Sequence, residues 1–271
     1  MNLTKDQINS FKKNGFISLK KVFTKKEINS FLREIDVLKT KKSDGNVFEN
    51  DGKTLRALHG SHFDSDLFND LTANIRLHNP SSQILSSNEI YTYQFKINFK
   101  SPFYGKSWPW HRDFTFWKIK DGMLEPNALN CAIFLDECNE FNGSLMMIKG
   151  SHNLFDDSYS EKRTEIQNEK KSWESDVNEN LTFIESEKFI KKIATDENLY
   201  LAKGEVGTVL YFHPNLIHAS NTNLSPFNRR LLIITYNTTS NAPVINSHSR
   251  PNFLVNYDSS PIIPKLTLNN N

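Results

Sequence analysis

Apolar residues recur with two different spacings along the chain, and the first spacing is helical. A first helix is expected to start after Thr4, which can cap it, and to end at Gly15. A second is expected after Thr24, which stands three residues before Glu27 as in a capping box. The apolar positions of these helices are Ile8 and Phe11 in the first, and Ile28, Phe31, Leu32, Ile35 and Leu38 in the second. We expect both, over about residues 1–40, to form a helical buttress for a sheet.

The second spacing is that of short apolar β-strands. Runs rich in β-branched and aromatic residues predict strands at Phe16–Leu19, Ile90–Phe99, Ala128–Leu135, Ser144–Ile148, Gly207–Phe212 and Leu231–Tyr236. Several short strands in one chain, with a long insertion between them, are typical of two facing sheets. The sequence therefore predicts a mainly β fold, a double-stranded β-helix of the jelly-roll or cupin type with N-terminal and inserted helices.

Two polar stretches interrupt this pattern. The segment Lys39–Asp51 is polar and contains turn residues, so we expect a loop or lid there. Residues at about 155–200 are charged and only weakly periodic, with helix-like pieces at Glu161–Lys171 and Glu185–Ile193. We expect that region to be a surface insertion over a single domain spanning residues 1–271.

Charge and composition exclude some partners. The chain has 33 lysines and arginines against 31 acidic residues, a net charge of +2, and no long basic block. Nothing in it therefore calls for nucleic acid or an anionic membrane. The longest apolar runs are short, and the first residues lack the apolar core of a signal peptide, so a cytoplasmic protein is expected. Cys131 and Cys138 are interpreted as buried reduced thiols, and a homodimer stays open.

One short motif suggests metal chemistry when it is combined with two later residues. Trp110–Phe114 contains His111 and Asp113 in a His-x-Asp pair, and His218 lies much further along the chain. Two histidines and one carboxylate form the facial triad of non-haem Fe(II) oxygenases, which leaves other positions on the metal open. On a strand, the paired side chains would share one face. Arg229, eleven residues after His218, adds a planar charged group suited to a carboxylate.

Other features of the sequence are expected to be structural. His59 and His62 are interpreted as loop or helix-edge histidines, because no partner ligands follow at a suitable spacing. His152 is expected to stabilise a turn, and His213 should lie on the face opposite the ligand His218. The Asn142-Gly143 pair is a hairpin signal that needs no chemistry.

A longer series of motifs resembles a known family. The series consists of Gln94–Lys100, Trp110–Phe114, Trp117, Asp121–Met123, Asn142-Gly143, Gly150–His152, His218–Asn223, Ser225–Phe227, Arg229, Tyr236-Asn237 and Arg250-Pro251. In this order, over roughly residues 90–255, it resembles the phytanoyl-CoA dioxygenase family of Fe(II)- and 2-oxoglutarate-dependent oxygenases. Within that family the likeness is strongest to the ectoine hydroxylases.

The resemblance implies roles for particular residues. It implies that His111, Asp113 and His218 bind Fe(II), with 2-oxoglutarate and O2 as co-substrates. It also implies that 2-oxoglutarate binds Arg229, helped by Asn98 and Ser220.

Further residues matching the family lie at its substrate positions. Gln94 would lie between co-substrate and substrate, while Trp117 and Phe212 would face the substrate. For the two aromatic residues, an ordinary core position is an equally good interpretation.

Departures from the ectoine hydroxylases redirect the expected substrate. Thr115 stands where they have an acidic residue and is followed by Phe116, and Leu231 stands where they have asparagine. We therefore predict a hydroxylase of a small polar metabolite, a free amino acid or related zwitterion, that yields hydroxylated product, succinate and CO2. Asp113 favours hydroxylation, because related halogenases replace this carboxylate with a small residue.

Four alternatives stay open at this point. Within the same family, the protein could be an ectoine 5-hydroxylase, or it could direct oxidation to desaturation or ring formation. From other classes, it could be a non-oxidative metal-dependent cupin enzyme or a non-catalytic jelly-roll binding protein.

Overall fold

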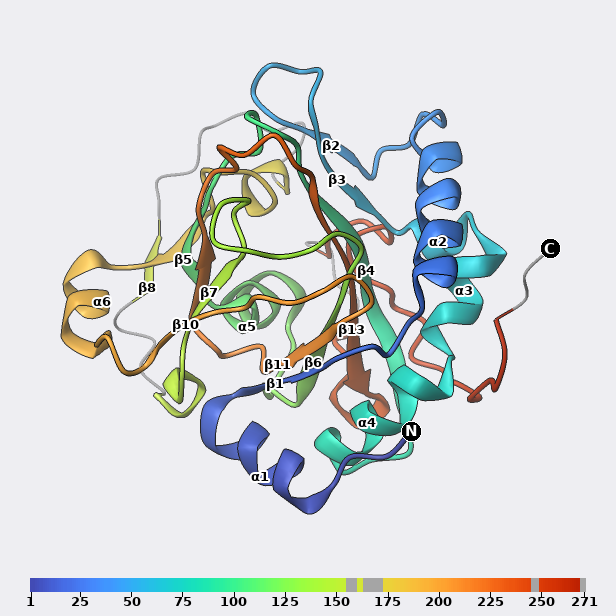
Figure 1. The fold of residues 1–271 in the computed structure, drawn as a ribbon. Coiled ribbons are helices and arrows are strands. Elements are labelled where there is room, and N and C mark those ends of the chain that lie inside the picture. Colours follow the sequence, from blue (N-terminus) through green and yellow to red (C-terminus); the bar gives the residue numbers. More distant parts are fainter. Residues whose placement is uncertain (155–159, 163–172, 245–248, 269–271) are drawn as a thin grey trace.

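Two antiparallel sheets dominate the computed structural model, which describes residues 1–154, 160–162, 173–244 and 249–268 (Figure 1). The seven-stranded sheet has the order β1 (Phe16–Leu19), β11 (Val209–Phe212), β6 (Ala128–Phe134), β13 (Arg229–Thr238), β4 (Ile90–Lys100), β3 (Leu55–His59) and β2 (Asn46–Phe48). The four-stranded sheet has the order β10 (Leu199–Leu201), β7 (Leu145–Ile148), β12 (His218–Ser220) and β5 (Trp108–His111). A small third sheet pairs β8 (Ser160–Lys162) with β9 (Phe183–Glu185). The two larger sheets form the predicted jelly roll, as an open sandwich in the part of the chain described.

Helices cover the outer face of the seven-stranded sheet (Figure 1). The covering helices are α1 (Lys5–Asn14), α2 (Lys25–Leu38), α3 (Asp66–Thr72) and α4 (Ile75–Leu85), while α5 (Asp113–Phe116) and α6 (Glu187–Ile193) do not belong to this layer. Capping boxes at Thr4 and Thr24 start the first two helices as predicted, and Gly15 ends α1 in a left-handed conformation. None of the described helices is long and apolar enough to cross a bilayer.

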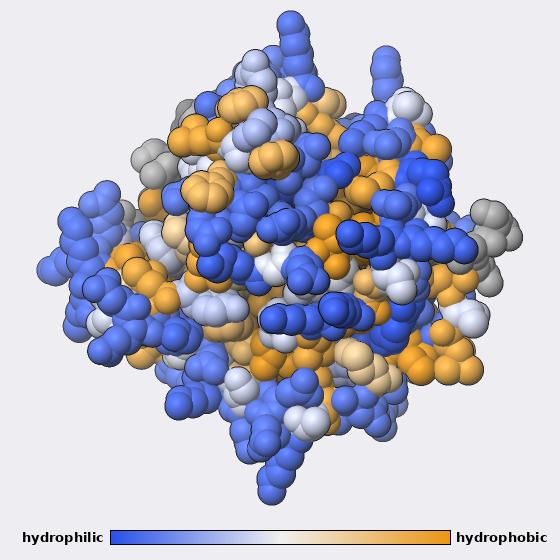
Figure 2. Space-filling view, in the orientation of Figure 1, coloured by the Kyte–Doolittle hydropathy of each residue, from blue (hydrophilic) through white to orange (hydrophobic). Residues whose placement is uncertain are grey.

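The period-two pattern of the strands separates the two faces of this sheet. In β13, Leu232 and Ile234 pack with the helices, whereas Leu231 and Ile233 belong to the cluster between the sheets. The inner cluster also holds Phe212 of β11 and Met147 of β7, so it joins both sheets. Strands β7 and β11 are apolar throughout, whereas β4 carries polar residues at alternate positions. Most of the surface in Figure 2 is hydrophilic, with scattered hydrophobic patches.

Some predicted elements were wrong or incomplete. Lys39–Asp51, expected to be a loop, contains β2, which pairs with β3. Glu161–Lys171 was expected to be helical, but Glu161 and Lys162 lie in β8 and the remainder falls outside the described residues. Helices α3 and α4 were not predicted; α4 contains Pro80, which obscures its pattern in the sequence. The second half of the insertion does contain the expected helix, α6.

A substitution at Gly207 tests how closely the N-terminal segment packs against the sheet. The φ of Gly207 is +81°, and an added Cβ would lie 2.0 Å from the carbonyl oxygen of Phe23. We predict that Gly207→Ala lowers the free energy of unfolding by more than the roughly 1–2 kcal/mol of a left-handed alanine. Gly52→Ala is the matched control, because Gly52 has φ +65° with nothing within 4 Å of an added Cβ. Chemical denaturation of both variants checks this, and equal losses would contradict the tight contact.

Candidate metal centre and pocket

Three potential metal ligands converge between the sheets. His111 ends β5, Asp113 opens α5 and His218 begins β12. Strand pairing places His218 directly opposite His111, with ring centroids 4.2 Å apart. The Nε2 atoms of His111 and His218 lie 3.8 Å and 3.9 Å from the carboxylate oxygens of Asp113. One candidate ligand atom from each residue lies within 4.8 Å of the others, so the three can hold one metal ion.

Hydrogen bonds orient both imidazoles toward this point. Nδ1 of His111 lies 2.7 Å from the Pro109 carbonyl oxygen, and Nδ1 of His218 lies 2.9 Å from that of Leu216. Because a carbonyl only accepts, each Nδ1 must carry the proton, which leaves an Nε2 lone pair for a metal. Burial, with His218 adding to it, lowers the pKa of His111 to about 3. The neutral form needed for metal binding therefore prevails at neutral pH.

The carboxylate is held from the opposite sheet. Asn130 of β6 donates to Asp113 Oδ2 at 2.7 Å, and Thr235 of β13 donates to Asn130 Oδ1 at 2.8 Å. Burial acts to raise the pKa of Asp113, but the Lys96 charge, the two neighbouring imidazoles and the hydrogen bond from Asn130 outweigh it and leave the pKa below its ordinary value. Asp113 is therefore an anionic ligand with a fixed orientation.

The strand interpretation of the His-x-Asp pair was wrong for its second member. Pairing of β5 with β12 stops at His111, and Asp113 is the first residue of α5. The intervening Arg112 is still extended, with φ −117° and ψ 133°. Because Arg112 is extended, the Asp113 carboxylate lies on the same side of the chain as the His111 imidazole. The two side chains therefore share one face, as predicted, although the strand ends at His111.

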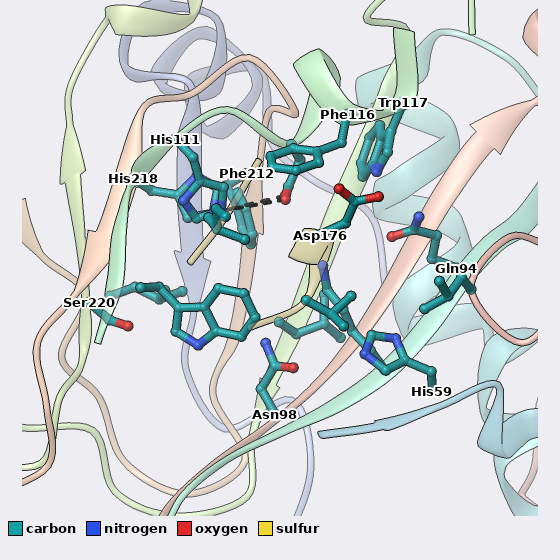
Figure 3. A pocket seen from close by; sticks show the side chains of 18 of the residues that line it. His59, Gln94, Asn98, His111, Phe116, Trp117, Asp176, Phe212, His218 and Ser220 are labelled. Carbon is teal, nitrogen blue, oxygen red and sulfur yellow. Dashed lines mark ion pairs between the residues drawn. The ribbon is translucent and has the colours of Figure 1, made fainter. Parts of the chain in front are cut away.

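A pocket adjoins the three ligands, and every candidate site residue of the sequence lies on its wall (Figure 3). Those residues are Gln94, Asn98, His111, Asp113, Trp117, Phe212, His218, Ser220 and Arg229. In the view of Figure 3, His111 and His218 lie on one side and Gln94 and His59 on the other. Trp117 and Phe212 are each 2% exposed, so they are buried and also line the pocket. The two interpretations of these aromatic residues are therefore compatible.

Arg229 is a buried cation, and part of its guanidinium group is hydrogen-bonded to the backbone. Its Nε and Nη2 donate to the Gly143 carbonyl oxygen at 3.1 and 2.8 Å. Burial lowers the pKa of Arg229 to about 10, so it stays charged at neutral pH. The Asn142-Gly143 turn was assigned no chemistry, but its carbonyl orients this arginine. Arg230 lies outside the pocket lining and pairs instead with Asp136, at 2.7 Å.

Sequence reasoning missed several side chains of the wall, chiefly His59, Lys96, Trp108, Asp176 and Arg250. Lys96 could have been found, because it alternates with Gln94 and Asn98 on one face of β4. His59 was interpreted as a loop or helix-edge residue, but it ends β3 opposite Lys96. It is not part of the metal cluster. Arg250 belongs to the Arg250-Pro251 motif of the resembling series but was given no role, and Asp176 ends a short helical turn, where no periodic signal exists.

The other histidines in the described part of the chain lie outside the pocket lining. His62 stacks on Phe95 with centroids 5.1 Å apart, and His152 donates to the Lys12 carbonyl oxygen at 3.1 Å. His213 accepts from the Asn215 amide, at 3.1 Å. Cys131 and Cys138 are buried and free, as expected.

Of the three positions that differ from the ectoine hydroxylases, only one lies on the pocket wall. Phe116 lines the pocket, whereas neither Thr115 nor Leu231 is among its described lining residues. Leu231 instead packs in the apolar cluster between the sheets.

Comparison with known proteins agrees with this chemistry. The phytanoyl-CoA dioxygenase family model matches residues 11–231. The chain is 32% identical to L-proline trans-4-hydroxylase of Streptomyces griseoviridis over 255 residues, which cover 93% of this chain and 92% of the relative. It is 30% identical to ectoine dioxygenase of Bordetella bronchiseptica over 257 residues, covering 92% and 81% of the two chains.

Solved structures give the same result. The crystal structure of EctD from S. alaskensis with 2-oxoglutarate and 5-hydroxyectoine matches with a TM-score of 0.81 and 25% identity, covering 97% of this chain and 87% of that one. The structure of EctD with bound Fe matches with a TM-score of 0.79 and 26% identity, covering 97% and 86%. The jelly-roll fold is thus confirmed. Two neutral imidazoles and a carboxylate are also a donor set that suits ferrous iron.

Removal of the histidines tests the metal assignment. We predict that the double variant His111→Ala, His218→Ala no longer retains iron but keeps a cooperative unfolding transition, because the strands are held by packing outside the site. Metal analysis after anaerobic Fe(II) loading and desalting measures the loss.

His152→Ala is the matched control and should keep its iron, because this buried histidine lies outside the pocket lining. Stoichiometric iron in the double variant would overturn the ligand assignment.

Proposed function

The chain belongs to the phytanoyl-CoA dioxygenase family, and we propose that it hydroxylates a free amino acid or a related small zwitterion. It is a non-haem iron and 2-oxoglutarate-dependent dioxygenase. The observation that carries the substrate proposal is the pocket in which the three candidate ligands and Arg229 meet polar and aromatic walls. A jelly-roll protein without catalytic activity would have no use for this combination.

The pocket has separate places for metal and co-substrate. His111, Asp113 and His218 would hold Fe(II), which supplies the oxidising chemistry when bound. The charged Arg229 suits the distal carboxylate of 2-oxoglutarate, since the Gly143 carbonyl already fixes the plane of its guanidinium. Ser220 supports this placement, because its buried hydroxyl accepts or donates no hydrogen bond among the described residues.

The remaining wall would hold the substrate. Gln94 offers an amide between the metal side and the outer wall, and Trp117 and Phe212 offer apolar surfaces. Phe116 lies against Phe183 of β9, with centroids 5.1 Å apart, and this contact fixes the Phe116 ring in the pocket wall. The chain would thus orient the substrate, and bound iron would supply the oxidising chemistry.

Relatives support both an amino acid and ectoine as the substrate. The identity to the L-proline hydroxylase is 32% and that to the ectoine dioxygenase is 30%, so identity alone does not separate them. The bulk of Phe116 in the pocket wall favours the amino acid. The cytoplasmic location and the homodimer stay predictions.

Arg229 tests the co-substrate site. We predict that Arg229→Leu raises the KM for 2-oxoglutarate by about 10-fold to 100-fold, the loss expected for one hydrogen-bonded charge. Steady-state kinetics with 2-oxoglutarate varied give the result. Arg230→Leu is the neighbouring control and should leave this KM unchanged, because Arg230 pairs with Asp136 outside the pocket. A larger effect from Arg230→Leu would show that the wrong arginine has been assigned.

The substrate class is tested by product formation. We predict that ectoine is hydroxylated poorly and that a small aliphatic amino acid gives clear coupled activity, because the Phe116 ring takes up room in the pocket wall. Each polar group of ectoine that this ring leaves unpaired would cost about 1–3 kcal/mol. The measurement compares hydroxylated product, not only succinate, from ectoine and from each common amino acid. If ectoine gives the highest kcat/KM, the protein is an ectoine hydroxylase.

A further inference from the structure

We propose that Asp176 binds the ammonium group of the substrate, so that the pocket selects amino acids by their free amino group. This inference rests on the proposed function, since it assigns one end of the same substrate. Asp176 lies at the end of the short helical turn Glu174–Asp176, in a segment that also supplies Val177 and Leu181 to the pocket wall. Figure 3 shows the Asp176 carboxylate among the side chains that face the pocket.

One oxygen of this carboxylate lacks a hydrogen bond. Oδ1 accepts from the Thr182 hydroxyl at 2.8 Å, whereas Oδ2 is buried and accepts no hydrogen bond among the described residues. The Asp176 side chain is only 1% exposed. A buried carboxylate oxygen without a donor is unfavourable, because it has lost water and gained nothing in exchange. A ligand with N–H donors and a positive charge would supply what is missing.

The neighbouring arginine does not fill this role. Arg250 donates from Nε and Nη2 to the two oxygens of Asp121, at 2.7 Å each, and Asp121 also accepts from the Tyr93 hydroxyl. Its remaining Nη1 lies 3.8 Å from Asp176 Oδ2, which is too far for a hydrogen bond. Because Asp121 already neutralises Arg250, Asp176 remains an anion with an incomplete partner. Burial accordingly raises the pKa of Asp176 despite the Arg250 charge.

The charges around the pocket favour a zwitterion over a simple cation. The cations of the wall are Lys96, Arg229 and Arg250, and the carboxylates are Asp113, Asp176 and the Asp121 bonded to Arg250. These charges balance, and so do those of Fe(II) and doubly charged 2-oxoglutarate. A ligand without net charge preserves this balance, while its ammonium group meets Asp176. The Lys96 ammonium group makes no hydrogen bond or ion pair within the described residues and lines the pocket, so a cation remains for the substrate carboxylate.

The test compares substrates with and without an ammonium group. The probes are L-proline, chosen because a relative is an L-proline hydroxylase, and N-acetyl-L-proline, which keeps the carboxylate and ring. We expect the wild-type protein to prefer L-proline strongly. Asp176→Asn should raise the KM for L-proline by about 10-fold to 100-fold, as expected for losing a charged hydrogen bond, and should remove most of the preference over N-acetyl-L-proline. The KM for 2-oxoglutarate should not change.

A binding measurement and a second variant exclude a purely structural role. Equilibrium dialysis of L-proline against anaerobic protein with Fe(II) and 2-oxoglutarate should show the same loss of affinity without turnover. Thr182→Val removes the hydrogen bond to Oδ1 but keeps the Asp176 charge, so it should retain the preference for the free amino group.

The outcomes of these experiments separate the possibilities. If Asp176→Asn binds L-proline like the wild type, or if Thr182→Val abolishes the preference equally, the ammonium site is wrong. If Asp176→Asn instead weakens 2-oxoglutarate, Asp176 belongs to the co-substrate site and the inference also fails. If the wild-type protein hydroxylates no common amino acid, the proposed function itself fails, which the panel of amino acids reveals before any variant is made. Should another amino acid exceed L-proline, that acid and its N-acetyl derivative become the probes.

Discussion

The pairing of β12 with β5 is the contact on which the site depends. It sets His218 opposite His111, and β12 is held on its other edge by β7, where His218 lies opposite Met147. A shift of one residue in this register would turn a ligand to the other face of the sheet. Since the ligands are far apart in sequence, only a strand fixed on both edges can keep them together without a metal.

Polar groups in the interior are satisfied by partners in different elements. Asp113 is held through Asn130 and Thr235 of the seven-stranded sheet, and Arg229 is held by the Gly143 carbonyl. Buried polar groups are favourable only when such networks are complete. The same hydrogen bonds that offset the desolvation of these groups therefore fix their orientation before any ligand enters, which lowers the entropy cost of binding.

The pocket combines rigid and irregular parts with different tasks. Strands supply the candidate metal ligands His111 and His218, and β13 supplies Arg229, so the chemistry common to the family lies on regular structure. Asp176 and Arg250 come from segments between or after the strands. Loops tolerate change better than strands do, so the segments that bear these two residues can alter substrate choice while the metal centre stays intact.

The sequence by itself determined the features that depend on near neighbours. Capping boxes at Thr4 and Thr24 and the apolar runs of the strands are local features, and the structure confirms them as helix starts and strands. The His-x-Asp motif is local as well, and both of its residues line the pocket. The Arg229 position was also found, because it belongs to an ordered series of motifs.

Only the tertiary structure decided which remaining polar residues meet. Lys96, Asp176 and Arg250 share one pocket although nothing in their local sequence relates them. The structure also shows that Asp113 begins a helix rather than continuing a strand. It further shows that the polar stretch contains β2, because pairing with a neighbouring strand can outweigh local composition. Propensity and periodicity act over a few residues, whereas burial and strand pairing join residues that are far apart along the chain.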